Sequence, residues 1–332
     1  MNIPYRKFED YLPVDTSKMR PKDSYKDLIK RRAFATEGLV EKYGKIPEDM
    51  IHYRPCPNCR SEKNVPELEK DYLKVVKCAN CGLVFVNPVF SENFYDQMYA
   101  SEIQQEIIKK LHEDSHEYRK ERFGKERIKL MSRFVKGPKI SYLDIGASSG
   151  YTVEAAAEVG WDAIGTELNP SAVKFAQVRG VNVIEGGLDH VDIKDKKFDV
   201  ISLFDVLEHI LEPMELLQAV LNNLADDGIL VLYLPNYTSA SVMLLGLDSH
   251  TIRPTHHLTY FTPETIISFL DSAGMNVEYM ITEGLDIADY IWRKEALDNK
   301  DMSALKEIQD KLQFFVNAGG YGLNLRVIAR KK

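Results

Sequence analysis

Four cysteines, all of those in the chain, fall into two C-x2-C pairs: Cys56 with Cys59 and Cys78 with Cys81. The pairs stand in the tetrapeptides CPNC and CANC. Thiolates at this spacing are typical of a zinc ribbon, in which four of them bind the metal tetrahedrally. A disulfide pair or a redox centre is the alternative, although cytosolic disulfides are rare. The pattern predicts a structural Zn²⁺ site in residues 55–90, where the metal supplies folding energy and no chemistry.

Two short stretches concentrate histidine and carboxylate side chains. One is FDVLEH, which ends an apolar run and contains Glu208 and His209. The other is HHLTYFTPE, which begins with His256 and His257. Histidine suits the removal of a proton from an alcohol or phenol, because its usual pKa lies near working pH. We expect His257 or His256 to be a general base, with His209 as the next candidate. Glu208 is a partner of the base, a ligand for a divalent metal, or an anchor of the next helix.

A third stretch, residues 139–170, has the pattern of a strand, a glycine-containing turn, a helix and a second strand that Glu167 closes. The turn, GASSG, supplies small residues where a backbone passes close to a ligand. A carboxylate at the end of the second strand accepts hydrogen bonds from ribose hydroxyls. The G-x-G-x-x-G pattern of dinucleotide-binding folds is absent. The stretch therefore predicts a nucleoside cofactor.

The sequence D-x-G-x-S-x-G, Asp144 to Gly150, resembles the first motif of class I S-adenosylmethionine (SAM) methyltransferases, [DE]-x-G-x-G-x-G. Ser148 departs from that pattern at the middle glycine. The FDVLEH stretch is similar to the segment in which cofactor and substrate meet in these enzymes. By this resemblance, the turn holds the amino-acid end of SAM and Glu167 holds the ribose. The residues predicted to bind the cofactor are Asp144, Gly146, Ala147, Ser148, Ser149, Gly150, Glu167, Leu168, Phe204 and Asp205.

A variant of the resemblance includes Mg²⁺. Some methyltransferases hold this ion through Glu-x-x-Glu-His and a distal histidine, and the matching residues here are Asp205, Glu208, His209 and His256. Asp205 departs from the first glutamate of that pattern. In either form, methyl transfer requires the enzyme mainly to align the acceptor and to remove its proton.

The elements that position these residues alternate between strand and helix from Lys139 onward. This alternation predicts an α/β fold, a Rossmann-like doubly wound sheet with ligands at the carboxyl ends of its strands. The class I resemblance implies seven strands. We expect a polar and helical arm (1–54), a zinc ribbon (55–90), a helical linker that covers the cofactor (91–136) and the catalytic domain (137–332). Residues 237–261 and 283–321 interrupt the alternation and are predicted substrate lids.

Composition limits the partners. With 43 basic and 50 acidic residues, the chain has a net charge of −7, which does not favour nucleic acid. Between Asp15 and Arg32 there is a local excess of basic residues, seven against three acidic ones. The chain contains no run of about 18 apolar residues that would span a membrane, and its N-terminus lacks an apolar signal core. We expect a cytoplasmic location.

Three functions follow from the sequence. The first is methylation of a small molecule, by preference the O-methylation of a sugar, because a ribbon joined to such a domain resembles bacterial sugar and natural-product methyltransferases. A nucleotide-sugar is a related acceptor. The second is RNA methylation, with the ribbon as an RNA-binding unit. The third is a non-catalytic interaction protein, against which Asp144, Gly146, Gly150 and Glu167 argue.

Overall fold

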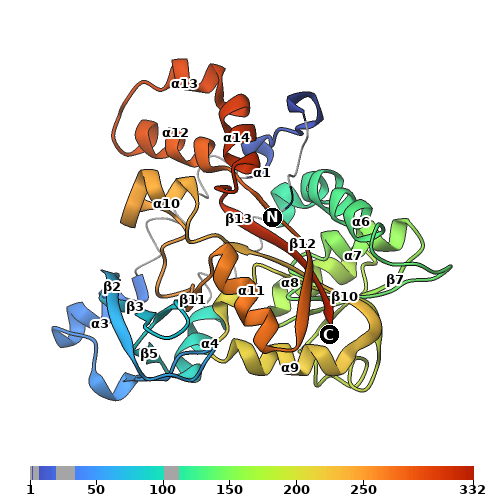
Figure 1. Cartoon of the computed structure of the whole chain (residues 1–332), viewed down its shortest axis with the longest axis horizontal. Helices are drawn as coiled ribbons and strands as arrows, with labels where there is room; N and C mark the ends of the chain where they lie inside the picture. The colour runs from blue at the N-terminus through green and yellow to red at the C-terminus, as the bar shows by residue number, and fades with distance from the viewer. Residues whose placement is uncertain (1, 3–6, 20–33, 101–111) are drawn as a thin grey trace.

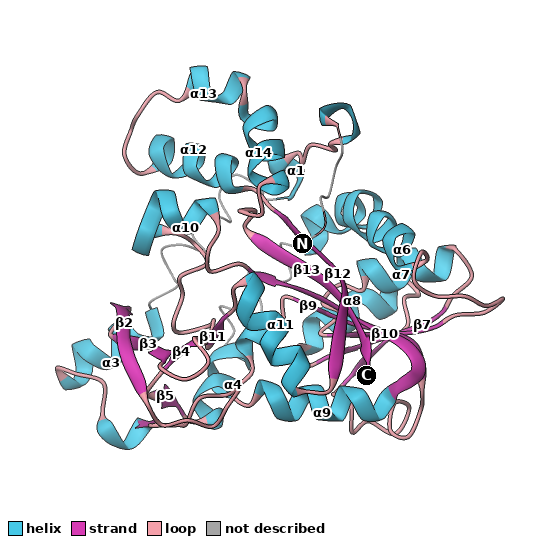
Figure 2. Cartoon of the chain, in the orientation of Figure 1, coloured by secondary structure: helices cyan, strands magenta, loops and turns pink. Residues whose placement is uncertain are grey.

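The computed structural model describes residues 2, 7–19, 34–100 and 112–332 (Figures 1 and 2). Most of the basic segment between Asp15 and Arg32, and residues 101–111 of the predicted linker, lie outside the described residues. The described N-terminal part contains the short helices η1 (Phe8–Asp10), α1 (Thr16–Met19) and η2 (Glu48–Met50), and the longer α3 (Phe34–Tyr43). Within the described ranges, no helix is both long enough and apolar enough to cross a membrane.

A seven-stranded sheet forms the centre of the molecule, as predicted. Its spatial order is β12-β13-β10-β9-β6-β7-β8. Neighbours from β10 to β8 run parallel, whereas β13 is antiparallel to both β10 and β12. The strands are β6 (Ser141–Ile145), β7 (Asp162–Glu167), β8 (Val183–Glu185), β9 (Phe198–Phe204), β10 (Leu224–Pro235), β12 (Met275–Glu283) and β13 (Asn324–Lys331).

Helices cover both faces of this sheet (Figure 2). On one face, α9 (Pro213–Asn223) and α11 (Pro263–Ser272) pack their leucine, isoleucine and phenylalanine side chains on the strands. On the other face lie α6 (Lys125–Met131), α7 (Tyr151–Glu158) and α8 (Pro170–Val178). The sheet is therefore doubly wound, and the loops after β6, β7 and β9 meet at one edge.

The cysteine-containing unit is a small antiparallel sheet of β2 (Asn64–Lys70), β3 (Leu73–Cys78) and β4 (Val84–Val86). Beside it, β1 (Ile51–His52) pairs with β5 (Val89–Phe90), and α4 (Glu92–Ala100) follows. The fourth strand of the small sheet, β11 (Thr259–Tyr260), comes from the C-terminal half of the chain and pairs with β4. The predicted lid at 237–261 thus includes a strand of the ribbon sheet, which sequence periodicity did not reveal.

The segment 283–321, the second predicted lid, forms a helical layer (top of Figure 1). It contains α12 (Asp286–Ala296), α13 (Ser303–Glu307) and α14 (Gln309–Ala318), and α12 packs on α10 (Ala240–Leu245), which is followed by η5 (Gly246–Asp248). The buried carboxylate of Asp286 joins these parts: it accepts hydrogen bonds from the backbone N–H of Ser241, from the side chain of Gln313 and from the backbone N–H of Leu323.

Candidate active site

The turn between β6 and α7 crosses closely over β7. The backbone N–H groups of Gly146 and Ala147 both donate to the carbonyl of Thr166, at 2.8 and 2.9 Å. Gly146 has a φ of 72°, and a Cβ there would lie 2.6 Å from Val206. Gly150 likewise has a positive φ, and a Cβ on it would lie 2.8 Å from Val181. Both glycines are therefore required by packing as well as by conformation.

Glu167 ends β7 beside this turn, as expected. Its two carboxylate oxygens accept hydrogen bonds from the backbone N–H groups of Ser148 and Asn169, each at 2.8 Å. These bonds fix the carboxylate at the sheet edge and leave each oxygen a second lone pair for a ribose hydroxyl. The next side chain, Leu168, is 76% exposed although it is apolar. Such a residue beside Glu167 suits contact with a base or a sugar.

Asp144 lies beneath the turn and not on its surface. Its carboxylate is buried and accepts a 2.6 Å hydrogen bond from Ser202, whose hydroxyl also contacts that of Tyr142. Burial raises the pKa of Asp144 to about 6, against the opposing effect of the Ser202 bond. Asp144 therefore supports the turn from inside, and its contact with SAM stays a prediction.

Residues 112–119 form a helical run that covers the turn. The Nε2 atom of His112 lies 2.7 Å from Oγ of Ser148, and Nδ1 of His116 lies 2.9 Å from Oγ of Ser149. Both imidazoles are buried. Residues 112–119, here called the cover, thus lie on the turn, and that they cover a cofactor stays a prediction; neither histidine was identified from the sequence. Their four-residue spacing, which places them on one helix face, was the available signal.

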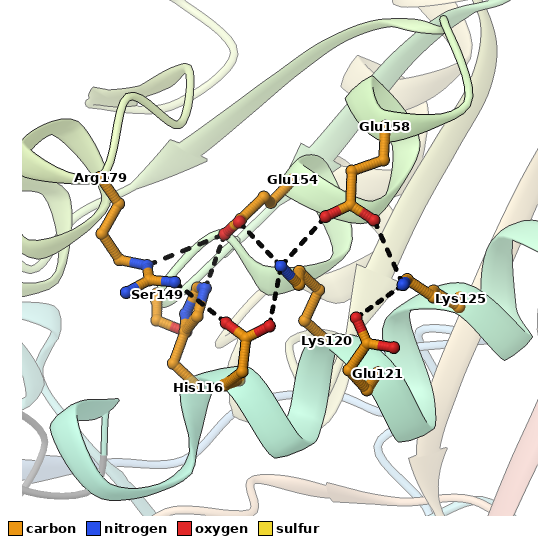
Figure 3. A network of polar contacts seen from close by, with 9 residues as sticks. His116, Lys120, Glu121, Lys125, Ser149, Glu154, Glu158 and Arg179 are labelled. Atoms are coloured by element: carbon orange, nitrogen blue, oxygen red, sulfur yellow. Dashed lines mark hydrogen bonds and ion pairs between the residues drawn. The ribbon is translucent and has the colours of Figure 1, made fainter.

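An ionic network holds this cover on α7 (Figure 3). Nε2 of His116 lies 2.8 Å from a carboxylate oxygen of Glu154. Lys120, which belongs to the π-helical turn η3 (Lys120–Gly124), lies within 3.1 Å of Glu117, Glu154 and Glu158. Because the Lys120 ammonium is largely buried, its charge needs these three partners. The network fixes the cover relative to α7, the helix that starts at the turn 146–150.

At the end of β9, Phe204 and Asp205 occupy different environments. Phe204 is buried, and the guanidinium of Arg127 lies 3.9 Å from the centre of its ring. The same arginine donates a 2.5 Å hydrogen bond to the hydroxyl of Tyr151. Asp205 has a φ of 56° and an exposed side chain, although desolvation by the surrounding protein raises its pKa. The Asp205 side chain therefore lies at the edge of the sheet, where it is open to solvent although protein surrounds it closely.

Three of the predicted catalytic residues come together next to Asp205. Glu208, His209 and His257 each offer an atom within 4.8 Å of the others. Glu208 and His209 belong to η4 (Leu207–His209), and Nε2 of His209 lies 3.5 Å from Oε1 of Glu208. Burial, reinforced by Asp205, raises the pKa of Glu208 well above its usual range. Neither carboxylate oxygen of Glu208 has a hydrogen-bond partner among the described residues.

The two ring nitrogens of His257 are both engaged. Nδ1 lies 2.7 Å from the carbonyl of Thr251 and therefore carries the proton, because a carbonyl only accepts. Nε2 lies 2.8 Å from the guanidinium of Arg253, which only donates. The third predicted histidine, His256, is outside the cluster: its Nδ1 lies 2.8 Å from Oγ1 of Thr255. The expected Mg²⁺ ligand set therefore differs from the observed cluster, in which His257 takes the place of His256 and Asp205 is not included.

The four cysteines lie together, as the spacing predicted. Sγ of Cys56 is 3.5 Å from Sγ of Cys81, Sγ of Cys59 is 3.6 Å from Sγ of Cys78, and all four lie within 4.8 Å of one another. Zinc–sulfur bonds of about 2.3 Å in a tetrahedron place the sulfurs about 3.8 Å apart. Since the thiols are not joined in disulfides, the donor set and its size fit a structural zinc ion.

Residues 115–279 match the family model described as a methyltransferase domain. The chain contains a class I SAM-dependent methyltransferase domain. This methyltransferase is 24% identical over 155 residues to a ubiquinone biosynthesis O-methyltransferase of Haemophilus ducreyi, across 42% of this chain and 66% of the relative. A protein of the same name from Xanthomonas euvesicatoria is 28% identical over 149 residues, which cover 41% and 62% of the two chains. The methyltransferase thus spans less than two thirds of the length of these curated relatives.

Among solved structures, a SAM-dependent methyltransferase from Archaeoglobus fulgidus aligns with a TM-score of 0.44 at 22% identity, over 62% of this chain and 92% of that one.

The residues that would hold SAM in the methyltransferase are those at the sheet edge where the loops after β6, β7 and β9 meet. The turn 146–150 suits the amino-acid end, because small residues let a ligand approach the backbone. Glu167 suits the ribose, since its carboxylate is fixed and keeps unused lone pairs.

Proposed function

We propose that this methyltransferase transfers a methyl group from SAM to a hydroxyl oxygen of a small-molecule acceptor, with His209 as the general base. The acceptor we expect is a sugar, a nucleotide-sugar or another hydroxylated metabolite. The observation that carries the proposal is the orientation of His209. Its Nδ1 lies 2.9 Å from the carbonyl of His256 and so carries the proton, which leaves the lone pair on Nε2.

Two features favour His209 over the other histidines. Its side chain is 23% exposed at the sheet edge where Asp205 reaches solvent, whereas that of His257 is buried and committed to Arg253 and Thr251. Burial, and secondarily Arg253, lowers the pKa of His209 to about 4. The imidazole is therefore neutral at pH 7, although so low a pKa makes it a weaker base than a solvent-exposed histidine. In this proposal His257 positions the loop and does not act as the base.

When bound, SAM would supply a methyl group that its sulfonium already activates, with the S–CH3 bond broken and the sulfur leaving as a neutral thioether. His209 would accept the hydroxyl proton at Nε2 while the acceptor oxygen bonds to the methyl carbon. The Glu208 carboxyl lies 3.5 Å from Nε2, but burial raises its pKa well above the usual range, which opposes a charged partner for the imidazolium at this position. Support for oxygen as the methylated atom comes from the two relatives above, which are named O-methyltransferases.

The test is turnover with a panel of hydroxylated acceptors, read as demethylated SAM formed and as added methyl mass in the product. Each of His209, His256 and His257 is changed to Ala in turn. We expect His209→Ala to lower kcat by at least about 100-fold, as loss of a general base does, with SAM affinity unchanged. Wild-type kcat in His209→Ala would refute the assignment of the base, and the absence of any methylated hydroxyl product from the wild type would refute the proposed reaction.

The proposed mechanism does not use Mg²⁺. A cation held by Glu208, His209 and His257 would have to displace the guanidinium of Arg253 from Nε2 of His257. We therefore expect turnover in metal-depleted buffer to be unchanged when Mg²⁺ is added. Activity that depends on added Mg²⁺ would favour the metal-binding alternative.

A further inference from the structure

The two segments that form the proposed base site both contact one arginine, Arg54, which directly precedes the ribbon. Arg54 stands two residues before Cys56, and only 6% of its surface is exposed. Its Nη1 donates to the carbonyl of Leu211, and its Nη2 donates to the carbonyl of Leu258 at 3.0 Å. A planar guanidinium presents its donors in a fixed fork, so one side chain sets the separation of these two carbonyls.

Both carbonyls lie next to the catalytic cluster along the chain. Leu211 follows His209 by two residues, and Leu258 directly follows His257. The segments are also joined to each other, because the backbone N–H of Leu258 donates to the carbonyl of Glu208 at 2.7 Å. A change in the position of Leu258 therefore moves both Glu208 and His257.

The ribbon holds Arg54 in place from its own side. The backbone N–H of Arg54 donates to Oδ1 of Asn87, and Nδ2 of Asn87 donates back to the carbonyl of Arg54. The guanidinium also lies 5.7 Å from the ring centre of Phe85, on β4. Since β4 pairs with β11, and the backbone N–H of Val86 donates to Leu258 at 3.0 Å, the ribbon sheet and Arg54 act on the same loop.

The geometry points to Arg54 as a positioning residue for methyl transfer: its guanidinium holds the Glu208–His209 and His256–His257 segments at the separation that the reaction requires. The zinc-binding ribbon thus supports the base site without contacting the acceptor. This inference rests on the proposed function, because it takes His209 to be the base. A positioning role also gives a reason for the burial of this arginine. Burial lowers the pKa of Arg54, and the charge of Glu212 partly offsets this effect.

The test compares Arg54→Lys and Arg54→Gln with Arg60→Gln as the matched control. Lysine keeps the charge but has no fork, so it cannot reproduce both bonds. Arg60 belongs to the ribbon, but its side chain is 61% exposed. It lies 3.0 Å from Glu212, and such a surface ion pair contributes little to stability. We expect both Arg54 variants to lower kcat by roughly 10- to 100-fold, as misplaced catalytic groups do. SAM affinity and zinc content should stay within about twofold of wild type, and the control should match wild type.

A second readout needs no acceptor and so separates this inference from the proposed reaction. Amide hydrogen exchange in residues 207–211 and 250–261 should rise in Arg54→Lys, whereas exchange in the cofactor turn 146–150 should not. Wild-type kcat together with wild-type exchange in these segments would overturn the inference. Exchange raised throughout the chain would also overturn it, because Arg54 would then be a residue of general stability. If the wild type methylates no hydroxyl, the proposed function fails, and the exchange measurement still decides whether Arg54 positions the loops.

Discussion

The Oγ atom of Ser148 lies 2.7 Å from Nε2 of the buried His112. Ser148 is the residue that departs from the glycine-rich motif, and its φ of 54° is one that glycine adopts more easily. The hydrogen bond joins this strained turn to the helical cover at 112–119. Ser148, which departs from the motif, therefore has a specific hydrogen-bond partner in His112. The other ring nitrogen of His112, Nδ1, has no hydrogen-bond partner within the described ranges.

The first prediction concerns this pair and the binding of SAM. His112→Ala should weaken SAM binding about fivefold to tenfold, because a buried hydrogen bond contributes roughly 1 kcal/mol and the cover would loosen. Ser148→Gly should have little effect alone, since glycine relieves the positive φ while the bond is lost. When Ser148 is already glycine, His112→Ala should weaken SAM binding less than it does in the wild type. The coupling energy between the two changes should be about 1 kcal/mol by calorimetric titration.

The control for this cycle is Asp114→Ala, an exposed position on the same helical run. It should bind SAM as the wild type does. If the effects of the two changes on the free energy of SAM binding were strictly additive, His112 and Ser148 would not cooperate. Their contact would then contribute nothing to cofactor binding.

The second prediction tests the ribose contact. Glu167→Ala should abolish the rise in melting temperature that SAM produces, because the carboxylate both faces the cofactor edge and holds the Ser148 N–H. Glu185→Ala is the matched control, as Glu185 ends the neighbouring strand in register with Glu167 and is exposed. Thermal shift with and without SAM measures both. A full shift in Glu167→Ala would remove Glu167 from the binding site.

The sequence predicted the parts of the molecule that local patterns determine. The doubly wound sheet follows from buried strands that alternate with capped helices, and the four-cysteine cluster follows from spacing alone. The observed elements keep close to the expected ranges: the helix expected from Tyr151 to Val159 is α7, Tyr151–Glu158. Such features depend on neighbours in the sequence, which is why one sequence suffices.

Long-range pairing was not predictable in the same way. The contact of Arg54 with Leu258 spans 204 residues, and the pairing of β11 with β4 joins two segments of only a few residues each. No periodicity marks a two-residue strand. The engagement of His257 by Arg253 likewise follows from loop conformation and not from spacing. The sequence therefore indicates all three histidines but places His257 and His256 before His209, the residue that the proposed function takes as the base.

The third prediction concerns metal removal. Metal analysis should return about one zinc per chain, by the four-thiolate count. Cys56→Ser should lose it, and the small sheet should then unfold, because a unit of this size depends on metal for its stability. Loss of metal should lower turnover more than SAM affinity, since β11 and Arg54 connect the ribbon to the base site and not to the cofactor turn. A Cys56→Ser variant with wild-type melting and turnover would contradict this prediction.

The last prediction uses the titration of Asp286. Burial raises the pKa of this carboxyl from its ordinary value of 3.8 to about 6, although Gln313, Ser241 and Leu323 donate hydrogen bonds to it. Between these two pH values, the folded chain keeps a proton that the unfolded chain has released. The contribution of Asp286 to the free energy of unfolding is therefore complete below pH 4 and is lost as the pH rises through about 6, by up to about 3 kcal/mol.

Asp286→Asn removes this titration and keeps one of the two acceptor oxygens, so the hydrogen bonds that it loses do not depend on pH. The stability advantage of the wild type over this variant should therefore be larger at pH 4.5 than at pH 7.5 by about 2 kcal/mol, measured by urea unfolding at both values. The control, Asp310→Asn, changes an aspartate of α14 that lies outside this hydrogen-bonded group. An advantage that stays constant or grows with pH would mean that Asp286 is ionised in the folded chain throughout this range, and that its three hydrogen bonds outweigh the cost of burial.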